Sequence, residues 1–471
     1  MNTFAVETLG CKVNQYETQQ IRQLLEEQGL QLVAVDARPE LLVINTCCVT
    51  QAASAKSRQA VRRGRKLNPN ALLIVSGCLP SAPNGELAGL GENLHLIGHT
   101  DDLADKIVQL IAQQKARQSR SSAPQLSKKP TYIKALNGPK IKDKNGLHTL
   151  QPLRRFEGQT RAFLKIQDGC DGVCSYCIIP RIRSKVRSKP IEMVLKEAEA
   201  LVQAGHKEIV LTGVFIGAYG KNTVRRKNWS SPAAGRSNQL ALLLREIAAV
   251  PGLERVRLSS LEPGDVTDEL LGAYEKFPNL VPHFHLPLQS GSERILARMR
   301  RQYTVAQFID VVKKAKRRLD RPAITTDIIV GFPGEADADF AQSLAIAEDV
   351  RFSKIHVFRY SSRAGTAASR MLPVVPSEVI KERSIVLHKL DKRLQAEFRR
   401  RFIGEKASVI IERLHPAGGR TERYFEVDAV SAQPLKRGEL VWGILAENAR
   451  EMYVVPGETP LTGQRVLKLK A

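Results

Sequence analysis

The sequence has no apolar run long enough to cross a membrane, since its longest local runs, such as residues 71–75, have only the length of a strand. Its first residues, MNTFAVETLG, lack the basic start and apolar core of a secretory signal. The seven cysteines are few and odd in number, which favours reduced thiols or metal binding over a disulfide framework. We therefore expect a cytoplasmic protein with no membrane partner.

Acidic residues are scarce relative to basic ones. The 471 residues carry 72 Lys and Arg against 48 Asp and Glu, a formal charge of +24. A chain of this length is expected to form roughly two to four domains, and its 43% of hydrophobic residues suffices for packed cores. So basic a balance favours a polyanionic partner, with nucleic acid first, although a generally basic surface would give the same charge.

A metal-binding motif lies in residues 167–180, QDGCDGVCSYCIIP, where Cys170, Cys174 and Cys177 have C-x3-C-x2-C spacing. No fourth cysteine follows nearby, whereas ferredoxin-type runs supply a cysteine for each iron of a [4Fe–4S] cluster. Three thiolates would leave one iron open, as catalytic metal sites do. A zinc site is the alternative, but the run has no second cysteine pair or nearby histidine, so we favour the iron–sulfur cluster.

Residues 1–114 alternate short apolar runs with amphipathic ones, a pattern typical of a parallel α/β domain. We expect strands at residues 3–8, 41–45 and 72–76, and helices at residues 17–28, 55–66 and 101–113.

One cysteine follows each of these three expected strands: Cys11, Cys47 and Cys78. The carboxyl ends of strands in an open α/β sheet are where ligands bind. We therefore predict a second three-thiolate cluster, with three unrelated buried cysteines as the alternative. Cys48 adjoins Cys47 and points elsewhere in most backbone geometries, so we predict that it is not a ligand.

Residues 115–158 break this pattern and hold eleven Lys and Arg against Asp143 and Glu157. Such a composition cannot bury enough apolar surface to order itself, and we predict a basic, largely disordered linker. Its charge would suit the tethering of RNA, although a solvated spacer has the same composition. A second basic insertion, residues 221–238, has five Lys and Arg and no acid, and we expect it over the mouth of the next domain.

From residue 159 to residue 390 the β/α alternation resumes for about six repeats, which predicts a partial (β/α)6 barrel of the TIM type. Strands are expected at residues 162–166, 208–212, 255–259, 283–287, 324–330 and 354–359. The cysteine run follows the first of these strands, at the catalytic mouth of such a barrel. Polar residues after later strands face the same mouth, among them Ser260, Glu262, Gln289 and Asp327.

Residues 402–471 contain short alternating runs between Gly- and Pro-containing turns, which predicts a small antiparallel β-barrel. Barrels of this kind bind single-stranded RNA through basic grooves and aromatic stacking. Candidates for such contacts are Arg420, Arg423, Tyr424 and Arg437. A plain structural cap is the alternative.

The C-x3-C-x2-C run resembles that of radical S-adenosylmethionine (SAM) enzymes. One family among them, the methylthiotransferases, is similar in RAFLKIQDGCDGVCSYCIIP, LTGVFIGAYG, RLSSLEP, HFHLPLQSGS, ITTDIIVGFPGE, FRYSSRAGT, TLGCKVNQYET, INTCCVT and SGCLP. The C-terminal segment resembles the TRAM RNA-binding domain of these enzymes. TLGCKVNQYE resembles the branch that modifies N6-threonylcarbamoyladenosine beside the tRNA anticodon.

This resemblance implies two [4Fe–4S] clusters with separate tasks. The cluster on the 170–177 run would reduce SAM to a 5′-deoxyadenosyl radical, which abstracts the hydrogen on carbon 2 of the adenine. The cluster on the three N-terminal cysteines would carry sulfur, accept a methyl group from a separate SAM and deliver the methylthio group. SAM-cradle residues would be Ser260, Glu262, Gln289 and Asp327, and RNA contacts would include Arg183, Lys185 and Arg187.

The partners that the resemblance implies are the tRNA anticodon stem–loop and an electron donor such as a flavodoxin or ferredoxin, with the enzyme as a monomer. Two related activities stay open, methylthiolation of isopentenyladenosine in tRNA and of a ribosomal-protein aspartate. A metal-containing RNA-binding protein without catalysis is the alternative outside the enzymes.

Overall fold

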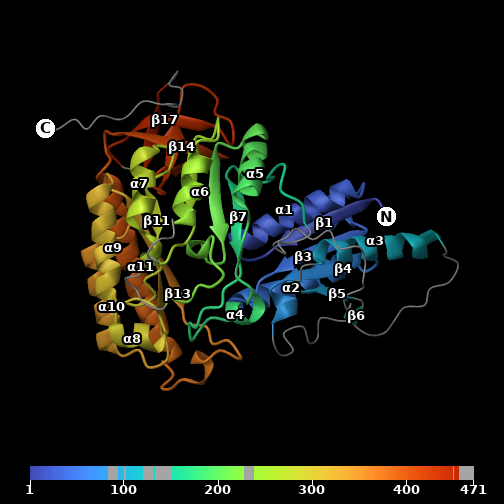
Figure 1. Cartoon of the computed structure of the whole chain (residues 1–471), viewed down its shortest axis with the longest axis horizontal. Coiled ribbons are helices and arrows are strands. Elements are labelled where there is room, and N and C mark those ends of the chain that lie inside the picture. The colour runs from blue at the N-terminus through green and yellow to red at the C-terminus, as the bar shows by residue number, and fades with distance from the viewer. Residues whose placement is uncertain are drawn as a thin grey trace.

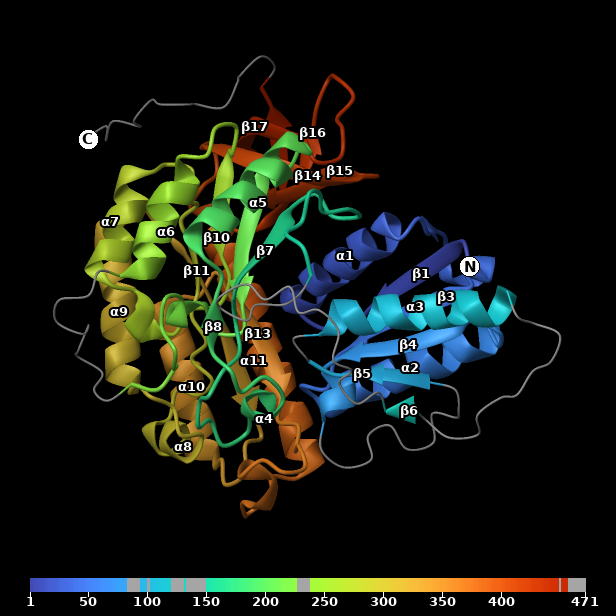
Figure 2. The same ribbon diagram turned by 45° about the vertical axis from the view of Figure 1, so that its right-hand side comes forward.

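The computed structural model describes residues 1–82, 94–99, 102–119, 131–132, 150–226, 238–448 and 450–455. It consists of an N-terminal α/β domain, a central β/α barrel and a small C-terminal β-barrel, the fold class that the sequence predicts (Figures 1 and 2). Within the described ranges, no helix combines the length and the apolar character needed to cross a membrane.

The N-terminal domain is built on a parallel sheet with strand order β2-β1-β3-β4-β5-β6. Its strands are β1 (Thr3–Thr8), β2 (Gln31–Leu32), β3 (Leu41–Thr46), β4 (Leu72–Gly77), β5 (Leu94–Ile97) and β6 (Thr131–Tyr132), and its helices are α1 (Lys12–Glu27), α2 (Gln51–Leu67) and α3 (Leu103–Ser119). Every residue of β3 and β4 is buried, because their continuous apolar runs are covered on both faces of the sheet. The short strands β2, β5 and β6 were not predicted.

The predicted linker is wrong at both ends. Helix α3 continues to Ser119, so residues 115–119 are helical. Residues 150–158 pack back onto the protein, with Leu150, Leu153 and Phe156 buried. The Gln20 side-chain amide donates to the carbonyl of Gln151 at 2.8 Å, so polar contacts to α1 also hold this segment. Apart from β6, residues 120–149 lie outside the described part of the chain.

The central domain is an open barrel of six parallel strands, in the order β7-β9-β10 and β11-β12-β13, joined by bridges between Val256 and Leu280 and between Ser260 and His285. The strands are β7 (Ala162–Asp168), β9 (Glu208–Gly213), β10 (Arg255–Leu258), β11 (His283–His285), β12 (Ala323–Val330) and β13 (Lys354–Arg359), with β8 (Arg187–Ser188) antiparallel to β7. The helices are α4 (Ile179–Ile182), α5 (Ile191–Gln203), α6 (Gln239–Ala248), α7 (Asp268–Lys276), α8 (Glu293–Arg298), α9 (Val305–Arg318), α10 (Asp337–Val350) and α11 (Ser377–Arg400).

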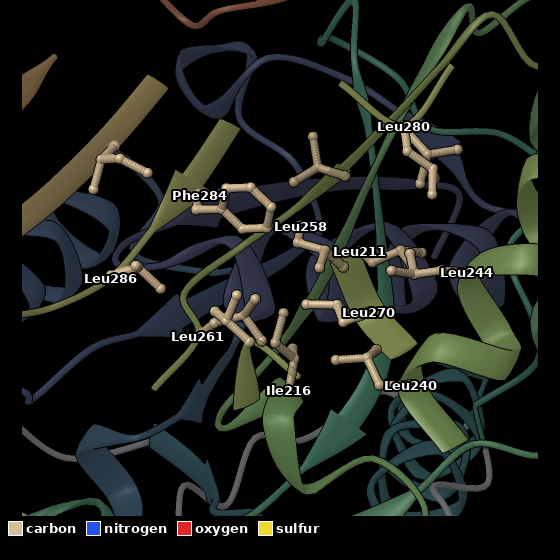
Figure 3. Close-up of a cluster of buried hydrophobic side chains, with 14 of the residues drawn as sticks. Leu211, Ile216, Leu240, Leu244, Leu258, Leu261, Leu270, Leu280, Phe284 and Leu286 are labelled. Carbon is tan, nitrogen blue, oxygen red and sulfur yellow. The ribbon is translucent and has the colours of Figure 1, made fainter. Parts of the chain in front are cut away.

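The largest apolar core joins these strands to their outer helices. Figure 3 shows part of it, where Leu211 of β9, Leu258 of β10 and Phe284 of β11 meet Leu240 and Leu244 of α6. All five side chains are almost fully buried. Burial of a Leu or Phe side chain stabilises a fold by about 1.5–3 kcal/mol, so this layer holds the barrel strands in place.

The C-terminal domain is a closed barrel in the order β14-β15-β16-β18-β17. Its strands are β14 (Lys406–Leu414), β15 (Ala417–Thr421), β16 (Glu426–Val430), β17 (Leu440–Leu445) and β18 (Glu451–Val454). The prediction of a wholly antiparallel barrel is wrong in one pair, because β16 and β18 run parallel. Strand β15, AGGRT, has no apolar alternation because Gly418 and Gly419 lie where a Cβ would strike neighbouring strands.

The two outer domains contact different parts of the central barrel. The C-terminal barrel covers the amino ends of the central strands, where the Arg257 guanidinium donates to the carbonyls of Thr421 (3.1 Å) and Glu422 (3.0 Å). The N-terminal domain lies beside the barrel, with α1 packed against β7 and β9 (Figure 2). The turns that carry the cysteines are therefore free to meet at the opposite end from the C-terminal barrel.

Candidate active site

Three cysteines gather at one edge of the N-terminal sheet, as predicted. Cys11 precedes α1 after β1, Cys47 follows β3 directly, and Cys78 follows β4 directly. Because β1, β3 and β4 are neighbours, their carboxyl ends bring the thiols within electrostatic reach of one another. We call this set the N-terminal trio. Cys11 is exposed, and the other two are buried.

Gly10 and Asn14 hold the turns after β1 and β3 against each other. Gly10 has φ +106°, and a Cβ there would lie 2.6 Å from the Cβ of Cys47, so only glycine permits this approach. The side-chain amide of Asn14 donates to the carbonyls of Leu9 (2.8 Å) and Thr46 (2.9 Å). Contacts within the protein therefore fix the positions of these two turns.

Cys78 has two polar neighbours. His99 Nε2 lies 3.4 Å from Cys78 Sγ, and the Cys48 thiol lies 3.4 Å from the Cys78 carbonyl oxygen. Hydrogen bonds from Cys48 and His99 outweigh burial and hold the pKa of the Cys78 thiol well below its usual range. The prediction that Cys48 is not a ligand is compatible with its position, buried and directed at the Cys78 backbone.

The second set, which we call the central trio, comprises Cys170, Cys174 and Cys177 in the loop after β7. Gly169 opens this loop with φ +78°, and a Cβ there would lie 1.8 Å from a backbone carbonyl oxygen of the returning chain. The amide of Gly172 donates to Cys170 Sγ at 3.3 Å. The loop therefore folds tightly, and its three thiols lie within electrostatic reach of one another.

Arg301 connects the central trio to the strand ends of the barrel. Its Nη1 lies 3.1 Å from Cys174 Sγ, and its Nη2 forms an ion pair with Glu262. The side chains of Arg301 and Glu262 are largely buried, with 7% and 13% of their surfaces exposed. Glu262, expected in the SAM cradle, therefore orients the arginine that contacts a cluster cysteine.

Each trio brings together three free thiols, the ligand type and number that a [4Fe–4S] cluster with one open iron would need. Burial raises the pKa of the Cys47 and Cys177 thiols to about 12 and that of Cys170 to about 11, so a cation must displace their protons to bind. In the part of the chain that the structure describes, no three His, Cys, Asp or Glu side chains are spaced to hold one ion. In a [4Fe–4S] cluster each thiolate binds a different iron, which requires a wider spacing.

An apolar contact joins the ends of the two domains that carry the trios. Cys48, Cys78 and Leu79 of the N-terminal domain form a buried cluster with Ile178 and Ile182, which follow the central trio. The contact places the two trios on either side of one interface. It also excludes water from that interface.

Arg183 belongs to this interface and not to an RNA-binding surface. Its Nη1 lies 2.7 Å from Glu17 Oε1 and 3.0 Å from Asp168 Oδ1, with only 4% of its side chain exposed. The prediction that Arg183 contacts RNA is therefore wrong, because two carboxylates inside the protein occupy its guanidinium. Of its predicted companions, Lys185 is exposed and Arg187 is half-buried.

The central barrel encloses a polar cavity of about 230 Å³. Two of the four predicted cradle residues, Ser260 and Asp327, line it, whereas Gln289 and Glu262 do not. The Asp327 carboxylate is paired with His285, at 3.2 Å from Nε2. The other lining residues are Lys12, Arg161, Val210, Arg257, Leu258, Ser259, His283, Thr325, His356, Phe358 and Tyr424. The cavity thus extends from the mouth to the floor of the barrel.

Tyr424, one of the residues predicted to bind RNA, lies at the floor of this cavity, with Arg420 and Arg423 close to it in the chain. The Tyr424 ring stacks on His283 with centroids 4.2 Å apart and an interplanar angle of 9°, and the Arg420 guanidinium lies 4.5 Å from the Tyr424 ring centroid. Arg423 is paired with Asp320 and Glu422. Tyr424 and Arg423 dock the C-terminal barrel onto the central one, so their assignment to RNA is corrected. The Arg420 side chain pairs with Glu426 inside the C-terminal barrel, and its contact with RNA stays a prediction.

The second basic insertion begins against the central trio. Asp171, inside the cysteine loop, accepts hydrogen bonds from the Thr223 hydroxyl (2.6 Å) and the Val224 amide (2.8 Å). Residues 221–226 therefore lie at the mouth, as predicted for this insertion, and residues 227–237 are outside the described ranges.

Comparison with known proteins identifies the family. Residues 164–347 match the radical SAM superfamily, and residues 3–98 match the family described as uncharacterized protein family UPF0004. The threonylcarbamoyladenosine tRNA methylthiotransferase MtaB of Thermotoga maritima is 38% identical over 421 residues, covering 88% of this chain and 87% of that protein. The chain belongs to the radical SAM methylthiotransferase family.

Other relatives of this radical SAM methylthiotransferase are consistent with the same family. The protein of the same name from Bacillus subtilis is 36% identical, covering 88% of this chain and 85% of its own. A tRNA-2-methylthio-N(6)-dimethylallyladenosine synthase from Thermobifida fusca is 33% identical, covering 87% and 78%. Among solved structures, the radical SAM methyltransferase TsrM of Kitasatospora setae has a TM-score of 0.51 at 14% identity, covering 76% of this chain and 73% of that one, which shows a shared fold alone.

Several residues of the methylthiotransferase site were missed from the sequence. Arg301 and His99 contact cysteines that lie far from them in the sequence, and no local sequence pattern predicts either contact. Lys12 and Asn14 belong to the TLGCKVNQYET motif, so the sequence shows that they are near Cys11. It does not show which residues their side chains contact.

Proposed function

We propose that the protein adds a methylthio group to carbon 2 of N6-threonylcarbamoyladenosine beside the anticodon of tRNA. The observation that carries the proposal is the meeting of two cysteine trios at one domain interface. Relatives named for threonylcarbamoyladenosine support this substrate at 33–38% identity, and those named for dimethylallyladenosine match at 30–33%.

The central trio would hold one [4Fe–4S] cluster together with SAM, and the N-terminal trio a second. When bound, the first supplies a radical able to take a ring hydrogen, and the second supplies the sulfur that replaces it. Carbon 2 carries no acidic proton, so radical chemistry is what an adenine ring requires at this position.

The protein's own residues prepare the site for these groups. Arg301 donates toward Cys174 while Glu262 fixes its orientation, so the positive charge stays beside the thiolate. The apolar contact around Leu79 and Ile178 keeps water from the space between the trios. An adenine in an RNA loop must leave its stack to present the edge that bears carbon 2. The exposed Lys185 remains a proposed contact for the RNA backbone.

Mass spectrometry of tRNA nucleosides from a deletion strain tests the substrate. We expect the 2-methylthio form of threonylcarbamoyladenosine to disappear and to return with the wild-type gene. Loss of methylthiolated isopentenyladenosine, or of the ribosomal-protein modification, would instead assign the protein to one of those substrates.

Iron analysis tests the proposed cofactors. After anaerobic reconstitution we expect about eight irons per chain, the content of two [4Fe–4S] clusters, and about four in either Cys174→Ala or Cys47→Ala. Cys174→Ala should stop SAM cleavage, whereas Cys47→Ala should keep it and lose methylthiolation. One zinc ion per chain and no iron would favour a non-catalytic RNA-binding protein. A flavodoxin or ferredoxin as the electron donor and a monomeric state stay predictions.

A further inference from the structure

Lys12 enters the central cavity from the N-terminal domain. It is the first residue of α1 and directly follows Cys11, and its side chain lines the cavity. The lining includes three cations, Lys12, Arg161 and Arg257, but Asp327 is its single carboxylate. Cations outnumber carboxylates in this lining, and one of them, Lys12, directly follows a cysteine of the N-terminal trio.

Two of these cations already have partners. Arg161 Nε lies 2.7 Å from Glu412 Oε1, and Arg257 Nε lies 2.8 Å from Glu208 Oε1. Lys12 makes no ion pair or hydrogen bond with any other residue of the described ranges. A half-buried ammonium group without a counter-charge calls for an anion.

Two of the imidazoles that line the cavity, His283 and His356, have lowered pKa values. Burial lowers the pKa of His356 to about 4 and that of His283 well below its usual range, and the nearby Lys12 charge lowers both further. His283 is 3% exposed, and its Nδ1 has no hydrogen-bond partner.

The size of the cavity limits what it can take. Its 230 Å³ falls below the roughly 300–1,000 Å³ of pockets that enclose a whole drug-sized ligand. The cavity is thus smaller than a site that encloses a whole nucleoside, whereas a small polar branch of a substrate fits. The branch must carry a negative charge to match Lys12 and hydroxyl or amide groups to match the histidines.

We propose that this cavity receives the threonylcarbamoyl branch of the substrate, with the Lys12 ammonium paired to its carboxylate. The inference rests on the proposed function and explains how the enzyme would select threonylcarbamoyladenosine as its substrate. The branch leaves the adenine from N6, which shares an edge of the ring with carbon 2. A pocket for it must therefore lie beside the reaction centre, and Lys12 adjoins Cys11 in the N-terminal trio.

An apolar isopentenyl branch would be rejected by the same residues. It would leave Lys12 without a partner and would take water from the cavity histidines without replacing its hydrogen bonds. A site built to bind polar groups rejects the analogue that lacks them much more strongly than an apolar pocket rejects an added hydroxyl. Lys12 is thus a specificity-determining residue.

The test is a cycle between Lys12 and the substrate carboxylate. Reconstituted full-length wild type and Lys12→Met are given two anticodon stem–loop RNAs, one with threonylcarbamoyladenosine and one with its threonyl carboxylate converted to an amide. We expect wild-type kcat/KM to fall by roughly 10- to 100-fold on the amide RNA, the worth of a charged hydrogen bond. For Lys12→Met we expect the ratio between the two RNAs to be close to one.

The controls separate the charge at this position from charge in general. Lys313→Met removes an exposed lysine from the outer helix α9 and should discriminate as the wild type does. Lys12→Arg keeps the charge and should keep part of the discrimination. Iron content and SAM cleavage without RNA should be the same in Lys313→Met as in the wild type, and both are measured in the Lys12 variants so that kcat/KM values are compared at equal cluster content.

Three results would overturn the inference. The first is equal wild-type activity on both RNAs, and the second is full discrimination between the RNAs by Lys12→Met. The third is loss of RNA-free SAM cleavage in Lys12→Met with intact clusters, which would show that the cavity binds SAM. Failure of the proposed function gives a different result, since the wild type would then not methylthiolate the carboxylate RNA at all.

Discussion

The Arg183 guanidinium of the central domain and the Glu17 carboxylate of helix α1 form a buried ion pair, with Nη1 and Oε1 2.7 Å apart. Lys165 and Asp168 complete the group, at 2.9 Å from Lys165 Nζ to Glu17 Oε1 and 3.1 Å to Asp168 Oδ2. Burial by itself would raise the pKa of Glu17, but Arg183 and Lys165 outweigh it and hold the pKa well below its usual range. The docking of the two domains therefore depends on this charge network.

Replacement of Arg183 by Met should destabilise the protein by about 3–5 kcal/mol, because it leaves the Glu17 carboxylate buried beside too little positive charge. Urea unfolding followed by circular dichroism measures the change. The pair Arg183→Met and Glu17→Gln should recover part of the loss. An effect below about 1 kcal/mol for the single variant, the size of an exposed pair, would contradict the network's role.

Glu208 should make stability depend on pH in the acid range. Burial opposes its ionisation, but Arg255, Arg257 and Arg161 lower its pKa to about 2. Because the folded pKa lies below the unfolded value of about 4.3, the stabilisation is complete above that pH and is lost as the pH falls toward 2. The pH-dependent part is about 3 kcal/mol. Unfolding free energies of wild type and Glu208→Gln, measured from neutral to acid pH, should converge by this amount, and a constant difference would refute the assignment.

Arg301 should tune the central cluster electrostatically. Its guanidinium beside Cys174 stabilises the more negative, reduced state of a bound cluster. Arg301→Gln should therefore lower the midpoint potential by on the order of 50 mV, since about 59 mV corresponds to a tenfold change for one electron. An EPR-monitored redox titration of the reconstituted protein measures the potential. An unchanged potential with normal iron content would show that the ion pair of Arg301 and Glu262 only supports the structure.

Tyr424 should hold the C-terminal barrel on the central one. Tyr424→Ala removes the stack on His283, an aromatic contact that contributes about 0.5–1.5 kcal/mol beyond its buried area, and opens the cavity floor. We expect faster cleavage between α11 and β14 in limited proteolysis. Tyr424→Phe keeps the ring and should behave as the wild type. Equal cleavage of all three proteins would show that the hydrogen bonds from the Arg257 side chain to the backbone of Thr421 and Glu422 suffice to hold the barrel in place.

The basic segment at residues 120–149 should set part of the salt dependence of tRNA binding. For each phosphate that the segment neutralises, its removal should reduce the slope of log K against log salt by roughly 0.9 on duplex and 0.7 on single-stranded RNA regions. Affinity measured over a range of salt concentrations, for wild type and a variant with glutamine in place of the lysines, gives the slope. An unchanged slope would make the segment a spacer. The lysines are Lys128, Lys129, Lys134, Lys140, Lys142 and Lys144.

The sequence by itself determined where the cysteines gather and the β/α order. A strand, a glycine turn and a cysteine are local features, and the period of the apolar residues distinguishes a buried strand from a helix. Cys11, Cys47 and Cys78 could therefore be assigned to one sheet edge, because parallel strands end at a common edge. The spacing of the 170–177 run likewise pointed to the radical SAM superfamily without any tertiary contact, and residues 164–347 match that superfamily.

Only the tertiary structure decided what the charged residues do. Arg183 and Arg423 read as RNA contacts because an arginine in a loop is usually exposed, yet each has a carboxylate partner in another domain. Lys12 read as an ordinary motif residue, yet it lines a cavity formed mainly by another domain. Whether a charge meets solvent, a carboxylate or a substrate depends on contacts between segments more than a hundred residues apart. No local period encodes such contacts, because they depend on how the domains pack.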